Sequence, residues 1–216
     1  MINTIKKSLT DSLSPMVLIF ILKIGLASIA IWSTILWYFW DFFSGFVTSY
    51  LTWIPWDWAQ DSVSYVAAPF IGYTLIIITI SILTSLYSET LLIALAKKHY
   101  PEKKVIGSPS IRGSIFATLK SAFIFAFLFM ILWPTIFIPL VGQVIMLYLW
   151  SILLKAPTVH DVGGLFISNK KELKIKRKKS TLIAMTASLF NYIPLLNLFA
   201  PIFAQIMFLH HILGKK

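Results

Sequence analysis

The chain has 216 residues, of which 58% are hydrophobic and only 12% charged, and 19 Lys and Arg against 8 Asp and Glu give it a net charge of +11. An average soluble domain carries about 25% charged residues, so this composition excludes a soluble globular enzyme. It also excludes a disordered chain, which needs low hydrophobicity and high charge. The ten-residue segments of alternating polarity that are typical of a membrane β-barrel are missing. The composition therefore predicts an all-α integral membrane protein.

Four apolar stretches are long enough for a bilayer, whose core of about 30 Å needs about 20 helical residues. The first predicted transmembrane helix covers residues 16–40 and contains one charge, Lys23, and the second covers 62–96. The third stretch is uncharged over residues 121–154, and the fourth is uncharged over 180–214 when its histidines are neutral. We expect them to lie in segments 114–155 and 181–214 of a single membrane domain that spans residues 1–216.

The charges between these stretches predict the topology. Bases precede the first stretch, fill the predicted loops 97–113 and 156–180, and close the chain, whereas residues 41–61 contain three aspartates and no base. Short basic loops stay in the cytoplasm, so we expect cytoplasmic termini and one external loop, 41–61. That loop holds three tryptophans suited to the headgroup region, Trp53, Trp56 and Trp58. We interpret the net charge as a topology signal and expect no nucleic-acid partner.

The third and fourth stretches begin and end on the same predicted side, so each has to turn within the membrane. A hairpin made from the 34 residues of the third stretch has two legs of about 15 residues, about 22 Å each, which is short of the far side. Helix-breaking residues lie near both midpoints: Pro134, Pro139 and Gly142 in the third stretch, and Pro194 and Pro201 in the fourth. The sequence therefore predicts two transmembrane helices and two proline-broken re-entrant helical hairpins that enter from the cytoplasmic side. A single proline-kinked span is the alternative for each hairpin.

A weak internal repeat supports similar tips for the two hairpins. Residues 137–142, with the sequence Phe-Ile-Pro-Leu-Val-Gly, parallel residues 192–197, with the sequence Tyr-Ile-Pro-Leu-Leu-Asn, 55 positions later. Irregular backbone at membrane depth has to be buried in protein or face a water-filled cavity. We therefore expect Gln143, Asn191 and Asn197 to line a solute path, with the helix N-termini at the tips attracting anions. The alternative is that these amides cap or link helices.

Two charged residues within the predicted spans are further path candidates. Lys23 lies about a third of the way into the first span, where a charge usually faces a partner or a cavity; snorkelling to the interface is the alternative. Glu89 lies late in the second span and is a possible partner of Lys23. No catalytic constellation or nucleotide-binding fingerprint is present, so we expect neither an enzyme nor a cofactor. His210 and His211 are adjacent and point about 100° apart on a helix, so we predict no metal site.

The first residues form a different kind of element. Ile5, Leu9 and Leu13 recur at helical spacing beside Lys6 and Lys7, before Pro15. This pattern predicts an amphipathic helix over residues 1–14 that lies at the bilayer interface. The seven bases within 170–179 are suited to anionic lipid headgroups.

The residues of the third and fourth stretches resemble a known family. Residues 137–143, Phe-Ile-Pro-Leu-Val-Gly-Gln, precede an apolar run that contains Trp150, and residues 189–199 read Leu-Phe-Asn-Tyr-Ile-Pro-Leu-Leu-Asn-Leu-Phe. Both resemble the CysZ-type sulfate permeases of bacteria, which belong to a wider superfamily with the etoposide-induced protein. The resemblance implies inner-membrane helical protomers with two long helices, two partly penetrating hairpins and a homo-oligomeric assembly.

The sequence departs from the family in two elements. A Gly-Leu/Ile-Arg-Arg element implicated in sulfate binding is replaced after Pro15 by Met16-Val17-Leu18-Ile19, and a Pro-Phe-Asn element by Tyr87-Ser88-Glu89. Loss of two guanidinium groups and gain of a carboxylate weaken the binding of a dianion. The helix N-termini and amides expected at the two tips nevertheless suit an anion, so we expect an inner-membrane permease or channel-like protein for a small solute, an inorganic anion such as sulfate, without ATP hydrolysis. The alternative is a non-transporting membrane organiser or accessory subunit.

Overall fold

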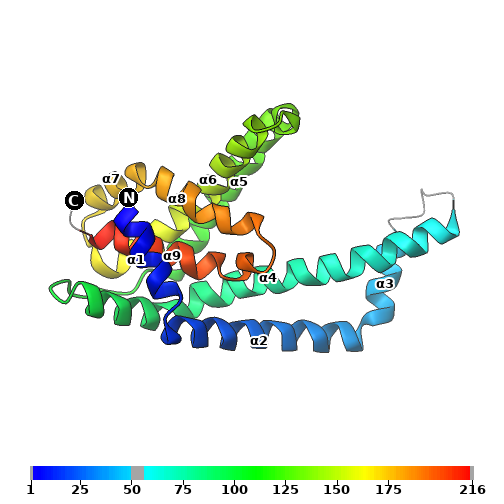
Figure 1. Ribbon diagram of the computed structural model, residues 1–216, viewed down its shortest axis with the longest axis horizontal. Helices are drawn as coiled ribbons and strands as arrows, with labels where there is room; N and C mark the ends of the chain where they lie inside the picture. The colour runs from blue at the N-terminus through cyan, green and yellow to red at the C-terminus, as the bar shows by residue number, and fades with distance from the viewer. Residues whose placement is uncertain (1, 50–55, 215–216) are drawn as a thin grey trace. The chain divides into compact units, whose positions relative to one another are not determined.

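The computed structural model describes residues 2–49 and 56–214, apart from the side chains of residues 48, 57–70, 137 and 170. All elements in these residues are helices, and no strand occurs among them (Figure 1). The chain divides into two compact units, residues 19–84 and residues 1–18 with 85–216. Within the described ranges four helices are long and apolar enough to cross a membrane: Pro15–Tyr38, Ile71–His99, Ile111–Ile136 and Val141–Phe166.

The unit of residues 19–84 contains most of α2 (Pro15–Tyr38), all of α3 (Trp40–Ser49) and the first part of α4 (Asp57–His99). Trp32 on α2 donates a hydrogen bond of 2.7 Å from its indole Nε1 to the hydroxyl of Thr79 on α4. This bond satisfies a polar group of each helix in an otherwise apolar surrounding. The predicted loop 41–61 contains most of α3 and the start of α4. Trp53 and the side chain of Trp58 lie outside the described residues.

The other unit contains a hairpin of two long helices, α5 (Ile111–Leu132) and α6 (Val141–Phe166), which lie side by side (Figure 1). A 3₁₀ helix, η1 (Trp133–Phe137), ends the first leg. Both legs are longer than the predicted 15 residues, since α5 has 22 residues and α6 has 26. The helices extend past Lys120 and Lys155, and α6 continues through Pro157 because its last turns are buried against the unit.

A second, shorter hairpin follows the basic helix α7 (Lys170–Lys179). Its first leg is α8 (Thr181–Ser188) with η2 (Leu189–Tyr192), and its second leg is α9 (Ala200–Leu213), preceded by η3 (Leu196–Leu198). Helix α9 contacts α1, α6 and α8 and forms the core of this unit. Ile206, Met207, Phe208 and Leu209 are completely buried, and burial of each such side chain stabilises the fold by about 1.5–3 kcal/mol.

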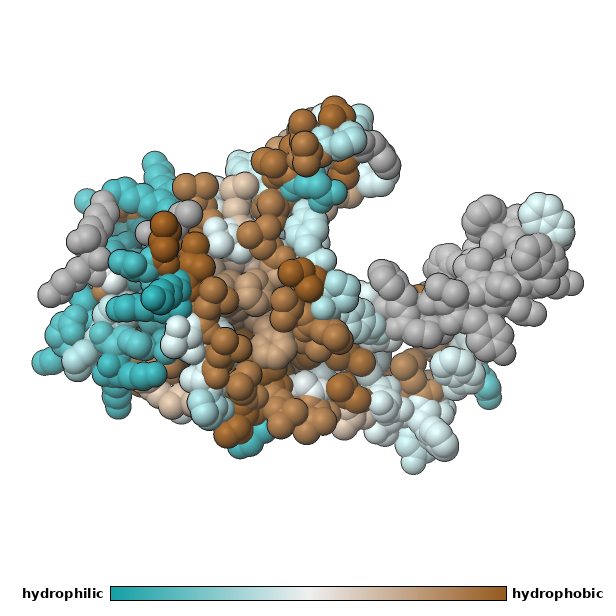
Figure 2. Space-filling view, in the orientation of Figure 1, coloured by the Kyte–Doolittle hydropathy of each residue, from teal (hydrophilic) through white to brown (hydrophobic). Residues whose placement is uncertain are grey.

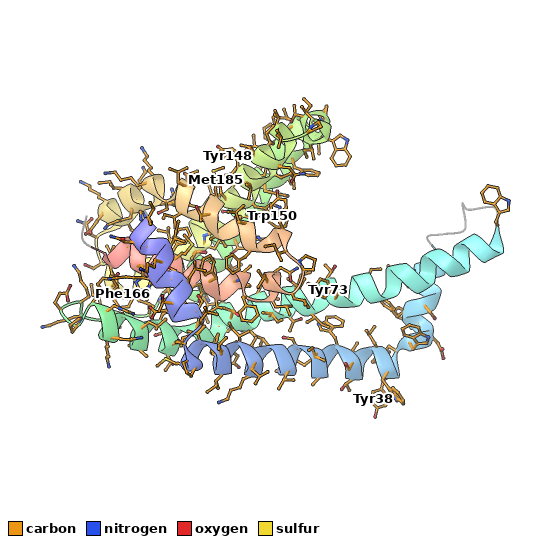
Figure 3. All side chains as sticks on the ribbon, in the orientation of Figure 1. Tyr38, Tyr73, Tyr148, Trp150, Phe166 and Met185 are labelled. Atoms are coloured by element: carbon orange, nitrogen blue, oxygen red, sulfur yellow. The ribbon has the colours of Figure 1, made fainter. Side chains whose placement is uncertain are left out.

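The surface of this unit separates charge from apolar residues. Figure 2 shows hydrophilic residues gathered over α7 and apolar residues over the tip of the α5–α6 hairpin. Figure 3 shows Tyr148 and Trp150 on α6 and Met185 on α8, where these two helices contact each other.

The C-terminal end of α9 is capped by a side chain of α7. Lys176 on α7 donates a hydrogen bond of 2.9 Å to the carbonyl of Ile212, so a cation stabilises this end of α9.

The N-terminal helix α1 (Ile2–Ser12) lies within the segment 1–14 for which an amphipathic helix is expected. Its polar residues Ser8 and Asp11 are buried against the unit, whereas Leu9 is exposed, as are Ile2 and Leu13. The helix is thus docked through polar contacts and leaves an apolar stripe on its outer face, an arrangement suited to a bilayer interface.

Candidate functional site

The two hairpin tips have the same backbone conformation. Leu140 and Leu195 have φ values of 65° and 69°, and they are the two non-glycine residues with positive φ in the described chain. Each follows an Ile-Pro pair in which the isoleucine is extended, and each preceding segment is a 3₁₀ helix. The sequence repeat at 55-residue spacing is therefore a structural repeat.

The first tip closes through two short backbone hydrogen bonds. The amide of Val141 donates to the carbonyl of Pro139 over 2.8 Å, which makes Leu140 the centre of a γ-turn, and the amide of Gly142 donates to the carbonyl of Ile138 over 2.8 Å. A Cβ atom on Gly142 would collide with the carbonyl oxygen of Ile136. Glycine is therefore required here by the close approach of another backbone segment and not, as the sequence suggested, by an unusual dihedral angle, since the positive φ of this tip belongs to Leu140. Pro134 stands in the first turn of η1, where it has no helical hydrogen bond to lose.

The second tip repeats this pattern. The amide of Asn197 donates to the carbonyl of Ile193 over 3.1 Å, in the place of the Gly142 bond. Pro194 precedes Leu195, and Pro201 stands in the first turn of α9, where proline is favoured. Each proline predicted to break a helix thus lies at a helix start or in a turn.

The three predicted path amides lie at these tips. Gln143 is exposed on the first turn of α6, Asn191 is exposed on η2, and Asn197 is half-buried in η3. The tips also meet: the hydroxyl of Tyr192, next to Asn191, lies 3.5 Å from the backbone carbonyl of Gln143. At this distance the contact is weak, but it brings the two predicted amide groups into one region of the unit.

The two predicted charged residues belong to different units. Lys23 is exposed on α2 in the unit of residues 19–84, and Glu89 is half-buried on α4 in the other unit. Glu89 accepts a hydrogen bond of 2.7 Å from the hydroxyl of Ser108. Glu89 therefore has a partner that the sequence did not suggest, and its pairing with Lys23 stays a prediction.

A buried polar cluster that the sequence did not indicate lies at the C-terminal ends of α1, α4 and α9. Asp11 on α1 is 1% exposed, and its carboxylate lies 2.7 Å from Nε2 of His99 on α4 and 2.9 Å from Nε2 of His210 on α9. The three residues come from the beginning, middle and end of the chain, so no local spacing indicates them. The one available signal is Asp11 itself, the only acid among the residues of α1.

Neighbouring polar groups orient this cluster. The hydroxyl of Tyr100 lies 3.0 Å from Nδ1 of His210, and the ammonium of Lys7 lies 5.6 Å from the centre of the Tyr100 ring. Burial alone raises the pKa of Asp11, but hydrogen bonds and charge from His99 and His210 outweigh it, so the net pKa lies below its ordinary value. Burial, and then the Asp11 carboxylate, raise the pKa of Tyr100. Asp11 is therefore an ionised carboxylate beside a neutral phenol.

A second polar group lies at the base of the first hairpin. The carboxylate of Asp161 on α6 accepts hydrogen bonds from the hydroxyls of Ser114 on α5 and, over 3.4 Å, Ser85 on α4. These bonds join three helices. His160 is adjacent to Asp161 in sequence, but the carboxylate is bonded to serines, so the group resembles a structural link more than a nucleophile with its base.

Long apolar helices, a docked amphipathic helix and paired broken hairpins define a multi-pass α-helical membrane protein. Residues 4–201 match the family described as sulfate transporter CysZ/etoposide-induced protein 2.4, and the chain belongs to this transporter-type family. The resemblance found in the sequence is thereby confirmed. The match ends before His210. Comparisons with curated proteins and with solved structures gave no significant match.

Proposed function

We propose that this protein is an inner-membrane permease or channel-like protein for a small inorganic anion such as sulfate, working without ATP hydrolysis. The observation that carries the proposal is the pair of matched tips at Leu140 and Leu195. Each tip places a helix start, that of α6 or α9, beside side-chain amides. Helix N-termini carry a partial positive charge, and amide N–H groups donate hydrogen bonds, so the combination suits an anion. Membership of a transporter-type family supports the same function.

In this proposal both hairpins enter from the cytoplasmic side and return to it. The legs of the second hairpin support this, because α9 has 14 residues, about 21 Å, against a core of about 30 Å. In the first hairpin the charged residues set the depth. The segment of α5 beyond Lys120 and the segment of α6 before Lys155 are about 18 Å and about 21 Å long. Lys155 donates a hydrogen bond of 2.9 Å to Thr181 at the base of the second hairpin, which favours an interfacial position.

The path needs more than one chain. Leu140 and Leu195 at the tips are 82% and 69% exposed in the single chain. Irregular backbone at membrane depth persists only where protein or enclosed water covers it. We therefore include a homo-oligomer in the proposal, with tips from several copies surrounding the path in a bacterial inner membrane.

The test is flux into liposomes that contain the purified protein. We expect uptake of labelled sulfate or of another small anion, and at least a tenfold lower rate for Asn197→Leu, because a half-buried amide at the tip is replaced by an apolar group. The matched control is Asn3→Leu, which removes an exposed amide from α1 and is expected to keep the flux. Equal flux for wild type and Asn197→Leu would contradict the assigned path.

A second candidate function is a non-transporting membrane organiser or accessory subunit. It is favoured by the missing arginine pair after Pro15 and by the outward apolar stripe of α1. Exposed apolar side chains beside basic residues bind anionic bilayers. In the same liposomes this function predicts no flux for any anion tested.

A further inference from the structure

We propose that Asp11, His99 and His210 form a binding site for a divalent transition-metal ion, with Zn²⁺ as the best-fitting ion. Two imidazole nitrogens and one carboxylate are a common donor set for zinc, and water completes the coordination when three protein ligands are present. One ligand atom from each of these residues lies within 4.8 Å of the others. The adjacent pair His210 and His211 was judged a poor site from the sequence; the structure instead brings His210 to residues from two other helices.

The two histidine rings converge on one point. Nε2 of His99 and Nε2 of His210 both approach Oδ2 of Asp11, at 2.7 Å and 2.9 Å. The rings are nearly perpendicular, at 78°, with centroids 5.1 Å apart, so they do not stack. Ligand atoms on one tetrahedral Zn²⁺ at about 2.0–2.1 Å are about 3.3 Å apart. The two oxygen–nitrogen distances therefore have to lengthen by about half an ångström, and the ion then replaces the protons that now lie between the groups.

The surroundings hold the donors in place. The hydroxyl of Tyr100, at 3.0 Å from Nδ1 of His210, fixes the ring so that Nε2 faces Asp11, as partners of metal-bound histidines usually do. Asp11 and His210 are each 1% exposed in their side chains, whereas His99 is 21% exposed. The site is thus preformed on two sides and open at His99, which provides a route for an ion from water.

The positive charges of nearby lysines lower the affinity of the cluster for a divalent cation. The ammonium of Lys98 lies 3.4 Å from Asp11 but its side chain is 58% exposed, so it can turn into water when a dication binds. Lys7 lies over Tyr100 rather than over the carboxylate. We therefore expect reversible binding that strengthens when Lys98 is replaced by Met, because one competing charge is removed.

A bound ion would link distant parts of the chain. His99 and His210 are 88 and 199 positions from Asp11. Cross-links that close long loops restrict the unfolded chain strongly, and binding to the folded state alone adds to its stability. The ion would hold the amphipathic helix α1 on α9 and on the end of α4.

The experiment uses the full-length protein, purified in detergent with a tag that contains no histidine. After incubation with a small excess of Zn²⁺ and desalting, bound metal is counted by mass spectrometry, and zinc-edge X-ray absorption identifies the ligands. We expect about one Zn²⁺ per chain and two imidazoles in its coordination shell. Asp11→Asn and His210→Gln should each lower the affinity at least tenfold. The matched control, His160→Gln, removes a histidine outside the cluster and should bind as wild type does.

Absence of bound Zn²⁺ in the wild-type protein would overturn the proposal, and so would a coordination shell without imidazole. Unchanged binding by a folded His210→Gln variant would also overturn it. If that variant does not fold, the wild-type absorption spectrum decides the question alone. A cluster held only by hydrogen bonds predicts no stoichiometric metal in any of these measurements.

Discussion

Leu140 and Leu195 occupy the same backbone position in two hairpins, each at positive φ directly after an Ile-Pro pair. A side chain at such φ values is strained, yet both residues are leucine rather than glycine. Both are also among the most exposed apolar residues of the chain. This exposure agrees with the proposal that the tips contact lipid or another copy of the chain.

Because φ is positive at the tips, we expect glycine to replace leucine there with little loss of stability, whereas a β-branched residue should destabilise the fold. Leu195→Gly should change the free energy of unfolding by no more than about 1 kcal/mol, because relief of strain offsets the added chain entropy. Leu195→Val should lower it by about 1–2 kcal/mol. Thermal unfolding in detergent, followed by tryptophan fluorescence, measures both. Leu196→Val, one residue later at ordinary φ, is the control and should have a smaller effect.

Gly142 is required because the backbone of Ile136 passes beside it. Gly142→Ala should lower the free energy of unfolding by about 1–3 kcal/mol, since the carbonyl that a Cβ would meet belongs to the backbone and has little room to move. Gly25→Ala is the matched control, because nothing lies within 4 Å of its Cβ position, and it should be neutral or slightly stabilising. Equal losses for the two variants in thermal unfolding would contradict this account of the first tip.

Asp11 docks α1 through a buried carboxylate. In the presence of a chelator, Asp11→Ala should lower the free energy of unfolding by about 3–5 kcal/mol, because two histidines lose their common partner. The N-terminal segment should also become sensitive to protease. Asp41→Ala, at an exposed position on α3, should be within about 0.5 kcal/mol of wild type. A stable, protease-resistant Asp11→Ala protein would show that α1 is held by other contacts.

The hairpins could be predicted because their signals are local. Pro139 and Pro194 interrupt the helices wherever the chain is placed, and their neighbours repeat at a constant spacing. The lengths of the legs could not be predicted, because the estimate of 15 residues comes from the uncharged stretch 121–154 and the helices continue past Lys120 and Lys155. Lysine is a good helix former, and the contact of Lys155 with Thr181 satisfies its ammonium within the fold.

The buried cluster could not be predicted for a different reason. Asp11, His99 and His210 are brought together by the packing of α1 against α9 and of the α4 end beside both. In the sequence His210 can be compared only with its neighbour His211, and because adjacent helical residues face different directions that pair makes a poor metal site. Only tertiary contacts between distant segments show which histidine has an acidic partner.

Accessibility of the tips tests the central claim most directly, and the natural lack of cysteine makes it simple to measure. Ile138→Cys and Leu196→Cys are treated with a membrane-impermeant maleimide in intact spheroplasts and in inverted membrane vesicles. Asp41→Cys and Lys178→Cys serve as the external and cytoplasmic controls. Re-entrant hairpins predict that neither tip is labelled in spheroplasts, in which Asp41→Cys reacts. Labelling of both tips from outside, as fast as that of Asp41→Cys, would contradict the re-entrant hairpins and the anion path built on them.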